Sequence, residues 1–590
     1  MNKSSIPCSK AAAQFSVAPS SFCRLTADVK FSPVLMRLIL SLGLLGLAPT
    51  HGAEPTFFSH AAVVSQDKIA SQVGADILRR GGNAMDAAVA TAFALAVTHP
   101  AAGNIGGGGF LVFRAANGEA VTYDFREKAP AAAHAKMFLR DDQYDADLHH
   151  HHHLSVGVPG TVAGLHLAWQ EHGRLPWPEL VQPAVQLAHD GFMVSTGLAR
   201  SLKSARPLLA KHPAALAQFT RQGVPYEAGE TLIQPELARS LGRIAGDGPA
   251  GFYEGVTAAL IEQEMQAHGG IITRADLKNY RAVKRTPLRG TYRGCEILSM
   301  PPPSSGGVTL VEMLNILEGY DLRRAGAGSV TNIHRVVEAM HRAFADRAQY
   351  LGDPDFNPDL PLARLTSKEH AAALRKTISP ARASVSSPTN FAWPPESKET
   401  THLSVVDSNR HAVALTYTLE QSYGSGIVVP GAGFLLNNEM GDFNAAPGLT
   451  TTNGLIGTAP NLAAPGKRML SSMTPTIVTR DGRLLLVTGS PGGRTIINTV
   501  LLTILNVVDF EMNAQAAVDA PRFHHQWLPD RILHERGGFS SKLLQSLRQR
   551  GHTLTESGSQ GAAEIIVVNG AGKLETGADQ RAADSGAAGW

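Results

Sequence analysis

A pair of threonines, Thr400 and Thr401, stands where a polar, proline-rich segment (residues 384–398) gives way to a run with β-branched residues and partial alternation. The first segment is typical of an exposed loop and the second of a β-strand. Backbone cleavage before Thr400 would leave a threonine with a hydroxyl group and a free amine on one residue. Such an amine titrates at about 7.7–8.0, so near neutral pH it can accept the hydroxyl proton. A Thr-Thr pair before a strand can also be purely structural.

The residues after Thr400 favour a β-hairpin. Residues 408–410 form a turn candidate, and residues 411–418 form a second strand-like run. A three-residue loop centred on Asn409 places residues opposite each other when their numbers sum to about twice 409, which sets Thr400 opposite Thr418. Opposed Cβ atoms in a sheet lie about 4.5–5.5 Å apart, so the second hydroxyl would be within reach of the first. The alternatives are a threonine pair that only suits a sheet, or a two-residue loop that breaks this register.

Two further segments carry charges that could hold a small charged molecule. Arg126 follows a predicted strand end, where its guanidinium could clamp a carboxylate; the alternative is a local ion pair with Asp124. Glu439 and Asp442 lie three residues apart on a short turn, where they could bind an ammonium group or cap the turn.

Two more segments could contact a reacting carbonyl group. The adjacent serines Ser471 and Ser472 precede a strand. A buried-looking strand, residues 484–488, runs into a glycine-rich turn that includes Gly492 and Gly493. Successive backbone N–H groups in such a turn form a concave nest that suits an oxyanion.

The histidines give weaker signals. The run His149 to His153 could bind a divalent metal ion, but nothing nearby in the sequence completes a site. His334, Glu338 and His341 share one helix face, which we interpret as a solvated or capping face. We therefore predict no metal site and no cofactor.

Size and charge narrow the classes of protein. With 590 residues, the chain can form two or more domains or one large intertwined domain. The formal charge of +3 is too small to indicate binding to nucleic acid or to a membrane surface. The cysteines Cys8, Cys23 and Cys295 have neither a metal-ligand spacing nor a disulfide framework.

The first 53 residues carry a predicted export signal. Arg37, an apolar stretch at 38–47 and small residues up to Ala53 make residues 36–53 typical of a secretory signal, too short to span a membrane. Residues 1–35 are a disordered leader or an extension upstream of a true start at Met36. We expect a periplasmic or secreted protein.

Periodicity predicts the elements that position these groups. Residues 154–333 are expected to be mostly α-helical, and residues 111–114 and 484–488 to be strands. Helices are predicted at 67–80, 83–97, 308–317, 331–350 and 496–508.

Taken in order, the motifs resemble one family. They are NIGGGGF, DFREKAP, MPPPSSGG, ETTHLSVVD, YT, NNEMGDF, RMLSSMTPT and GSPGGR. From about Phe58 to the C-terminus, the chain resembles the γ-glutamyltranspeptidases, which are N-terminal-nucleophile hydrolases. The resemblance implies an α/β fold, a four-layer αββα sandwich, and a precursor that cuts itself between Glu399 and Thr400. The products, a large subunit (54–399) and a small catalytic subunit (400–590), would stay together as a heterodimer.

The resemblance also implies roles for the residues singled out above. Thr400 is the expected nucleophile, supported by Thr418, with Gly492 and Gly493 as the oxyanion hole. The expected substrate contacts are Arg126, Ser471 and Ser472 for the α-carboxylate, and Glu439, Asp442 and Glu420 for the α-ammonium. Glu420 stands where some members have asparagine, and Asn453 stands where some bacterial members have a tyrosine in a lid loop (residues 446–465).

The implied activity is transfer of the γ-glutamyl group of glutathione and related donors. The acceptors would be water, amino acids or dipeptides, and no cofactor is needed. The alternatives are a related cephalosporin or glutaryl acylase, whose substrate has no ammonium group, and a non-catalytic protein that binds glutamyl compounds. A metal-binding protein built on the histidine run is a third.

Overall fold

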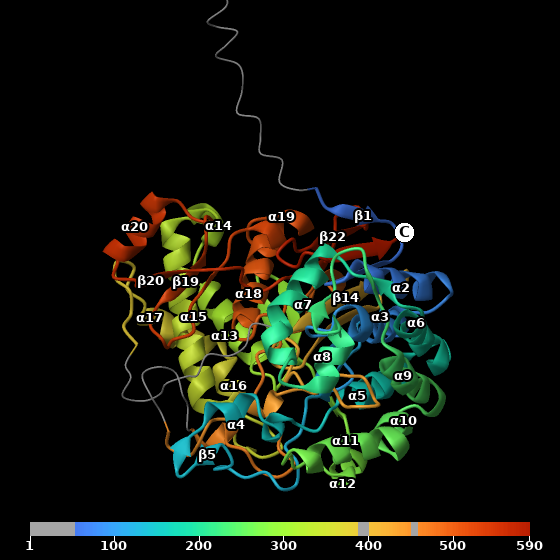
Figure 1. The fold of residues 1–590 in the computed structure, drawn as a ribbon. Coiled ribbons are helices and arrows are strands. Elements are labelled where there is room, and N and C mark those ends of the chain that lie inside the picture. The colour runs from blue at the N-terminus through green and yellow to red at the C-terminus, as the bar shows by residue number, and fades with distance from the viewer. Residues whose placement is uncertain (1–53, 387–399, 450–457) are drawn as a thin grey trace, which may run out of the picture. The chain divides into compact units, whose positions relative to one another are not determined.

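Two antiparallel sheets of seven strands form the centre of the fold (Figure 1). The computed structural model describes residues 54–386, 400–449 and 458–590, so the predicted leader, signal segment, Glu399 and Asn453 lie outside the described residues. The first sheet has the order β11 (Val283–Arg285), β4 (Ala120–Phe125), β3 (Gly108–Arg114), β15 (Ala412–Thr418), β14 (Thr401–Val406), β2 (Ala62–Ser65), β23 (Gly586–Gly589). The second has the order β1 (Thr56–Phe58), β22 (Leu574–Ala578), β21 (Glu564–Val568), β17 (Arg483–Thr488), β16 (Thr476–Arg480), β13 (Cys295–Ser299), β12 (Leu288–Tyr292).

The inner faces of the two sheets pack against each other through small and branched side chains. Ala62 and Val64 of β2 share one apolar cluster with Ile477 of β16 and Ile566 of β21. Val63, between the two β2 residues, belongs to a different cluster on the other face of its sheet. This alternation is the period of two expected for a strand that is buried on both faces.

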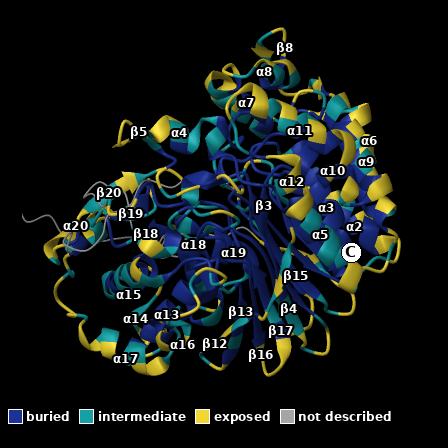
Figure 2. Cartoon of the chain, turned by 90° about the horizontal axis from the view of Figure 1, so that it is seen from below, coloured by how far each residue is buried: buried dark blue, intermediate teal, exposed yellow. Residues whose placement is uncertain are grey.

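Helices cover the outer face of each sheet. Those that share a core with the first sheet include α2 (Lys68–Arg79), α3 (Ala84–Thr98), α5 (Thr161–His172), α6 (Trp177–Asp190), α7 (Thr196–Leu209) and α9 (Pro235–Asp247). Those packed on the second sheet include α13 (Gly306–Leu317), α15 (Val330–Tyr350), α18 (Thr495–Val508) and α19 (Ala514–Asp519). The layers therefore run helix, sheet, sheet, helix, which confirms the predicted αββα sandwich, and Figure 2 shows the buried strands lying between the helices.

The remaining elements are shorter or peripheral. The helices are α4 (Ala146–His150), α8 (Pro213–Phe219), α10 (Ala250–Tyr253), α11 (Gly255–Ala267), α12 (Arg274–Asn279), α14 (Leu322–Ala325), α16 (Leu362–Leu365), α17 (Lys368–Lys376) and α20 (Ser541–Gln549). The 3₁₀ turns are η1 (His153–Ser155), η2 (Glu439–Asp442) and η3 (Ala459–Asn461). The small sheets contain β5 (Leu139–Arg140), β6 (Gln143–Tyr144), β7 (Phe192–Met193), β8 (Thr220–Arg221), β9 (Val224–Pro225), β10 (Thr231–Leu232), β18 (Phe523–His524), β19 (Ile532–Glu535) and β20 (Leu554–Ser557).

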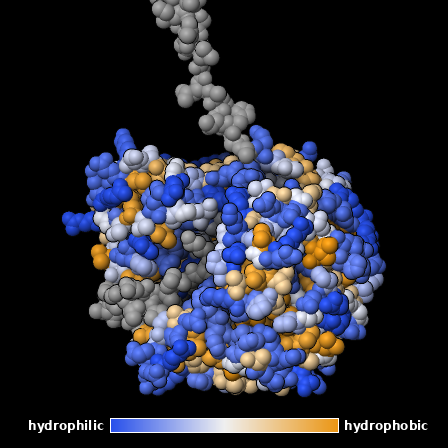
Figure 3. Space-filling view, viewed as in Figure 1, coloured by the Kyte–Doolittle hydropathy of each residue, from blue (hydrophilic) through white to orange (hydrophobic). Residues whose placement is uncertain are grey.

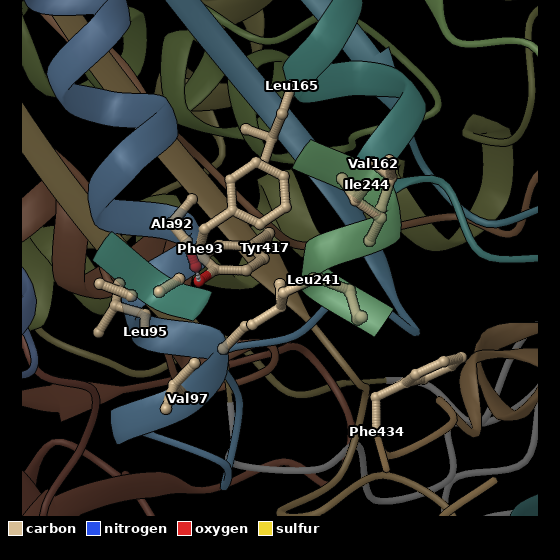
Figure 4. Close-up of a cluster of buried hydrophobic side chains, with 14 of the residues drawn as sticks. Ala92, Phe93, Leu95, Val97, Val162, Leu165, Leu241, Ile244, Tyr417 and Phe434 are labelled. Carbon is tan, nitrogen blue, oxygen red and sulfur yellow. Dashed lines mark hydrogen bonds between the residues drawn. The ribbon is translucent and has the colours of Figure 1, made fainter. Parts of the chain in front are cut away.

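The core beside the first sheet packs against the hairpin formed by β14 and β15. Phe93 of α3 lies beside Tyr417 of β15, with Leu165 and Leu241 around them (Figure 4). The buried Tyr417 hydroxyl donates a 2.9 Å hydrogen bond to the carbonyl oxygen of Ala92. A buried tyrosine needs such a partner, and here the bond ties β15 to α3.

The register of β14 and β15 is the predicted one. Thr401 pairs with Tyr417 and Leu403 with Leu415, so the residue numbers of each pair sum to 818. The pairing continues on the other side of β15, where Thr418 lies opposite Gly108 of β3. Thr400 therefore precedes β14 at the same end of the sheet at which Thr418 closes β15.

Most of the predicted helices form close to their predicted ends. Asp67 caps α2, and Asn83 and Asp86 form a capping box at the start of α3, so the buried carboxylate of Asp86 is hydrogen-bonded. The prediction for residues 154–333 missed β11, β12 and β13. These strands have only three to five residues, and β12 alternates exposed and less exposed positions in a polar sequence, so its strand character depends on pairing with β13.

The face of the molecule in Figure 3 is mostly hydrophilic, with scattered hydrophobic side chains. Within the described ranges, no helix combines the length and apolar character needed to cross a membrane.

Candidate active site

One cavity at the end of the β14–β15 hairpin gathers most of the predicted site residues. Its lining contains nine of them: Arg126, Thr400, Thr418, Glu420, Glu439, Asp442, Ser471, Ser472 and Gly493. Met473 and Ile496 complete it. Gly492 lies in the wall of a neighbouring cavity of about 480 Å³, so the two adjacent glycines border different spaces.

The two threonine hydroxyls face each other. Thr400 Oγ1 lies 3.3 Å from Thr418 Oγ1, and both residues are buried. The backbone N–H of Glu420 donates a 3.0 Å hydrogen bond to Thr418 Oγ1, which fixes that oxygen. The hydroxyl of Thr400 therefore has a positioned polar neighbour, as expected for a nucleophile that must be oriented.

The glycine run at residues 106–109, which leads into β3, lets the backbone approach Thr418. A Cβ on Gly107 would lie 2.0 Å from the carbonyl oxygen of Thr418, so no larger residue fits there without movement. The side chain of Asn104 completes the contact, because its Nδ2 donates to the Thr418 carbonyl (2.9 Å) and its Oδ1 accepts from the N–H of Gly107 (2.9 Å).

Arg126 lies fully buried between two carboxylates. Its guanidinium forms ion pairs with Glu439 and with Asp442, both on η2. Nε also donates to the carbonyl oxygen of Met469 (3.3 Å). Burial disfavours the charged guanidinium, but the carboxylates of Glu439 and Asp442 outweigh it and raise the pKa of Arg126. The alternative of a local side-chain pair with Asp124 is wrong, because Asp124 instead accepts from the backbone N–H of Arg126 (3.0 Å).

A third carboxylate, Glu127, lies in the same cluster. Its Oε2 is 3.6 Å from Arg126 Nη1, and neither of its carboxyl oxygens has a hydrogen-bond partner among the described residues. Burial raises the pKa of Glu127 to about 8, and burial with nearby carboxylates raises that of Glu439 well above its ordinary value. The raised pKa values favour the neutral forms of Glu127 and Glu439, and a cationic group bound beside them would favour their ionised forms. Glu127 is not among the site residues predicted from the sequence. The only signal in the sequence is its position next to Arg126, which does not indicate that the side chain is buried.

Ser471 and Ser472, which line the cavity, are positioned in part by Arg347, a residue that the sequence analysis did not assign to the site. Arg347 of α15 donates from Nη2 to Ser472 Oγ (2.8 Å) and from Nε to Ser305 Oγ (2.6 Å). Ser305 belongs to the MPPPSSGG motif and donates from its N–H to the carbonyl oxygen of Ser471 (2.7 Å). The motif therefore contacts Ser471 directly and Ser472 through Arg347. These contacts give a structural role to a motif whose role the sequence analysis left open.

The glycine turn lies directly before α18. The carbonyl oxygens of Gly492 and Gly493 accept hydrogen bonds from the N–H groups of Thr495 and Ile496, 3.0 and 3.1 Å away. Both glycines have a positive φ, 125° and 54°. Backbone N–H groups at the start of a helix are oriented to receive negative charge, so the geometry suits an oxyanion at Gly493.

The cavity thus combines a threonine hydroxyl with charges of both signs. The oxygen of Thr400, the guanidinium of Arg126 and the carboxylates of Glu439 and Asp442 are the groups needed to hold a zwitterion and attack a carbonyl near it. Among the described residues, the clusters with metal-ligand geometry are made by residues outside this cavity.

The comparisons with known proteins agree with this arrangement. The chain is 48% identical over 542 residues to the glutathione hydrolase proenzyme of Escherichia coli K12, covering 91% of this chain and 93% of that one. It is 38% identical over 537 residues to the acylase ACY 1 proenzyme of Pseudomonas sp. V22, covering 90% and 93%.

Solved structures share the fold. A cephalosporin acylase from Bacillus halodurans superposes with a TM-score of 0.80 at 26% identity, covering 92% of this chain and 98% of that one. The gamma-glutamyltranspeptidase of Helicobacter pylori gives a TM-score of 0.54 at 42% identity over 57% of this chain and 95% of that one. The family model described as gamma-glutamyltranspeptidase matches residues 70–589, which include every described residue of the cavity, and the chain belongs to this family.

Proposed function

We propose that this protein is a self-cleaving γ-glutamyl hydrolase and transferase, with glutathione among its donors. One observation carries the proposal: the hydroxyl of Thr400 lines the same cavity as Arg126 and the carboxylates of Glu439 and Asp442. A γ-glutamyl group bears an α-carboxylate and an α-ammonium at one end and the reacting carbonyl at the other. When the α-carboxylate and the α-ammonium are both bound, the γ-carbonyl group is oriented toward the nucleophile.

The first reaction is cleavage of the chain itself. Thr400 Oγ attacks the carbonyl carbon of Glu399, the C–N bond breaks, and the nitrogen becomes the free α-amine of Thr400. Water then hydrolyses the resulting ester and releases the Glu399 carboxylate. The hydroxyl of Thr418, 3.3 Å from Thr400 Oγ1, supports the attacking oxygen.

The cleaved pieces would remain together because their strands alternate within each sheet. In the first sheet, β14 and β15 of the small subunit lie between β2 and β3 of the large one. In the second sheet, β16 of the small subunit pairs with β13 of the large one. Separation would break several backbone ladders and both cores, so residues 54–399 and 400–590 are expected to form a stable heterodimer.

The same oxygen then acts on the donor. Thr400 Oγ attacks the γ-carbonyl carbon, with the new α-amine or a water accepting the hydroxyl proton, and the leaving amine departs with a proton. The oxyanion lies at the N–H groups of the Gly492-Gly493 turn. Water or the amine of an amino acid or dipeptide attacks the γ-glutamyl ester and restores Thr400.

The acylase alternative is less consistent with the cavity. A glutaryl group has no ammonium, so Glu439 and Asp442 would have no cationic group of the substrate to bind. The acidic pair in the cavity and the higher identity to the glutathione hydrolase of E. coli favour a γ-glutamyl donor.

The predicted signal at residues 36–53 supports export, and we propose a periplasmic or secreted location. This location is consistent with extracellular glutathione as a donor.

Product analysis tests the activity. Purified protein is incubated with glutathione, with and without glycylglycine, and acid-quenched samples are analysed by mass spectrometry. We expect glutamate without the acceptor, γ-glutamyl-glycylglycine with it, and a glutamyl group esterified to the chain that begins at Thr400. Turnover of a glutaryl amide with no turnover of glutathione would instead assign the acylase function.

A further inference from the structure

The five consecutive histidines separate into two groups in the fold. His149 and His150 lie against η2, where the carbonyl oxygen of His150 accepts a 3.0 Å hydrogen bond from Asn438 Nδ2. His153 points elsewhere, toward α11. The run therefore joins the wall of the catalytic cavity to a separate cluster of polar side chains.

That cluster contains two imidazoles and one carboxylate. His153 Nε2 lies 2.9 Å from Glu264 Oε1, and His268 Nδ1 lies 3.1 Å from the same oxygen. The rings of His153 and His268 stack with their centroids 4.7 Å apart. All three ligand atoms lie within 4.8 Å of one another. His212 is next to this group, with its ring centroid 6.0 Å from that of His153.

The chain geometry explains how these residues meet. Glu264 and His268 are four residues apart at the end of α11, so they lie on one face of the helix. The chain then turns at Gly269, whose φ is +74°, and passes over His153 at Gly270. A Cβ on Gly270 would lie 3.1 Å from the Cβ of His153, so the missing side chain allows this close approach.

We propose that His153, Glu264 and His268 form a binding site for a divalent transition-metal ion of the Zn²⁺ type. Zn²⁺ binds imidazole nitrogens and carboxylate oxygens at about 2.0–2.2 Å, so ligand atoms of a tetrahedral site lie roughly 3.3 Å apart. The observed separations of 2.9 and 3.1 Å between the imidazole nitrogens and Glu264 Oε1 need a few tenths of an ångström of opening, and the two nitrogens lie within 4.8 Å of each other. Mixed imidazole and carboxylate donors suit Zn²⁺, Co²⁺ and Ni²⁺ better than Ca²⁺ or Mg²⁺.

The burial of the three side chains suits this role. His153 and Glu264 are largely buried, with 7% and 11% of their side chains exposed, whereas His268 is 53% exposed. The ion can therefore enter from solvent on the side of His268, and water can take its fourth position. Bound there, it would cross-link α11 to η1.

Two other clusters among the described residues are weaker candidates. In the group of His334, Glu338 and His552, both carboxylate oxygens of Glu338 already accept hydrogen bonds from Ser384, and one pairs with Arg342. His334 and Glu338 are both buried, so of the two interpretations of the face that they share with His341, solvated or capping, the solvated one is wrong. In the group of Glu312, Asp346 and His370, burial and the neighbouring Asp346 raise the pKa of Glu312 well above its ordinary value, which favours the neutral acid.

Metal titration of the processed protein tests the site. The protein is treated with a chelator, dialysed, and titrated with Zn²⁺ by calorimetry and with Co²⁺ by visible absorption. We expect one ion per chain, and at least a tenfold weaker affinity in His268→Ala and in Glu264→Gln. Zn²⁺ should also raise the thermal unfolding midpoint of the wild type and leave that of His268→Ala unchanged.

A matched control variant distinguishes metal binding at this site from non-specific metal binding by the histidine run. His151 belongs to the same run but is not part of the cluster, so His151→Ala should bind Zn²⁺ within about twofold of the wild type. Equal loss in His151→Ala and His268→Ala, or no stoichiometric binding by the wild type, would overturn the proposal. Circular dichroism checks folding, and because the side chain of His268 is half exposed, its replacement should leave the core intact.

Discussion

Thr400 Oγ1 lies 3.3 Å from Thr418 Oγ1, across the open end of a hairpin whose turn is at Asn409. The relationship is set by strand register, because a shift of one residue would turn the Thr418 hydroxyl to the other face of the sheet. It gives the proposed nucleophile a hydroxyl neighbour that is itself fixed by the N–H of Glu420.

Thr418→Val should slow both self-cleavage and turnover, because valine keeps the shape of threonine and removes the hydroxyl that contacts Thr400. A hydrogen bond of this kind contributes about 1 kcal/mol in stability measurements, and more where a buried group loses its partner, so we expect at least a tenfold loss in each rate. The checks are a time course of the two chains on a denaturing gel and kcat with a γ-glutamyl anilide. Thr418→Ser, which restores the hydroxyl, should retain most of both rates; equal activity of the valine and serine variants would remove Thr418 from the site.

Arg126→Lys should raise KM for γ-glutamyl anilides by tenfold or more. A lysine ammonium is a point charge and cannot replace the planar fork that lies between η2 and the backbone of Met469 and Leu470. Steady-state kinetics measures the effect. Arg285→Lys is the control, because Arg285 pairs with Asp124 and Asp355 outside the cavity and its KM should not change. An unchanged KM in Arg126→Lys would exclude Arg126 from the carboxylate clamp.

Asp442→Asn should distinguish the two donor classes. Loss of the carboxylate removes an ion pair to the α-ammonium, so we expect kcat/KM for a γ-glutamyl anilide to fall by tenfold or more. A glutaryl anilide differs only in lacking the ammonium, and its slow turnover should change by less than threefold. An equal fall for both substrates would mean that Asp442 maintains the cavity without contacting the ammonium.

Buried histidine makes the fold sensitive to acid. Burial lowers the pKa of His402 to about 3 and lowers that of His149 well below its ordinary value. Between pH 6.5 and 4 the unfolded chain binds protons that these side chains do not bind in the folded state. The free energy of unfolding should therefore decrease as the pH is lowered through this range, by about 1.4 kcal/mol per pH unit for each such histidine.

Urea unfolding between pH 7 and 4.5 measures this slope. His402→Asn, which can keep a contact with Thr416, should reduce the slope, whereas replacing the exposed His189 by asparagine should leave it unchanged. Equal slopes in all three proteins would show that His402 is protonated in the folded state.

Local patterns in the sequence predicted the hairpin and most of the helices. The turn at Asn409 and the strand period fixed the register, and the motifs identified the residues that line the cavity. Helix α3 was predicted because its apolar run and its cap at Asn83 are both local signals.

Long-range packing explains what the sequence could not reveal. Arg347 reaches Ser472 across 125 positions, and His153 meets Glu264 across 111. The face of α15 that carries His334 looked polar, yet it is buried against His552 and Ser379. Such contacts depend on how helices and loops pack on the sheets, and periodicity along one segment does not contain that information.

Intact-mass spectrometry of the purified protein tests the central claim, that Thr400 is the nucleophile which both cleaves the chain and carries the γ-glutamyl group. The wild type should give two chains, the smaller beginning at Thr400 and ending at Trp590, and Thr400→Ala should give one uncleaved chain. A wild type that stays whole, a break at another bond, or two chains from Thr400→Ala would contradict it.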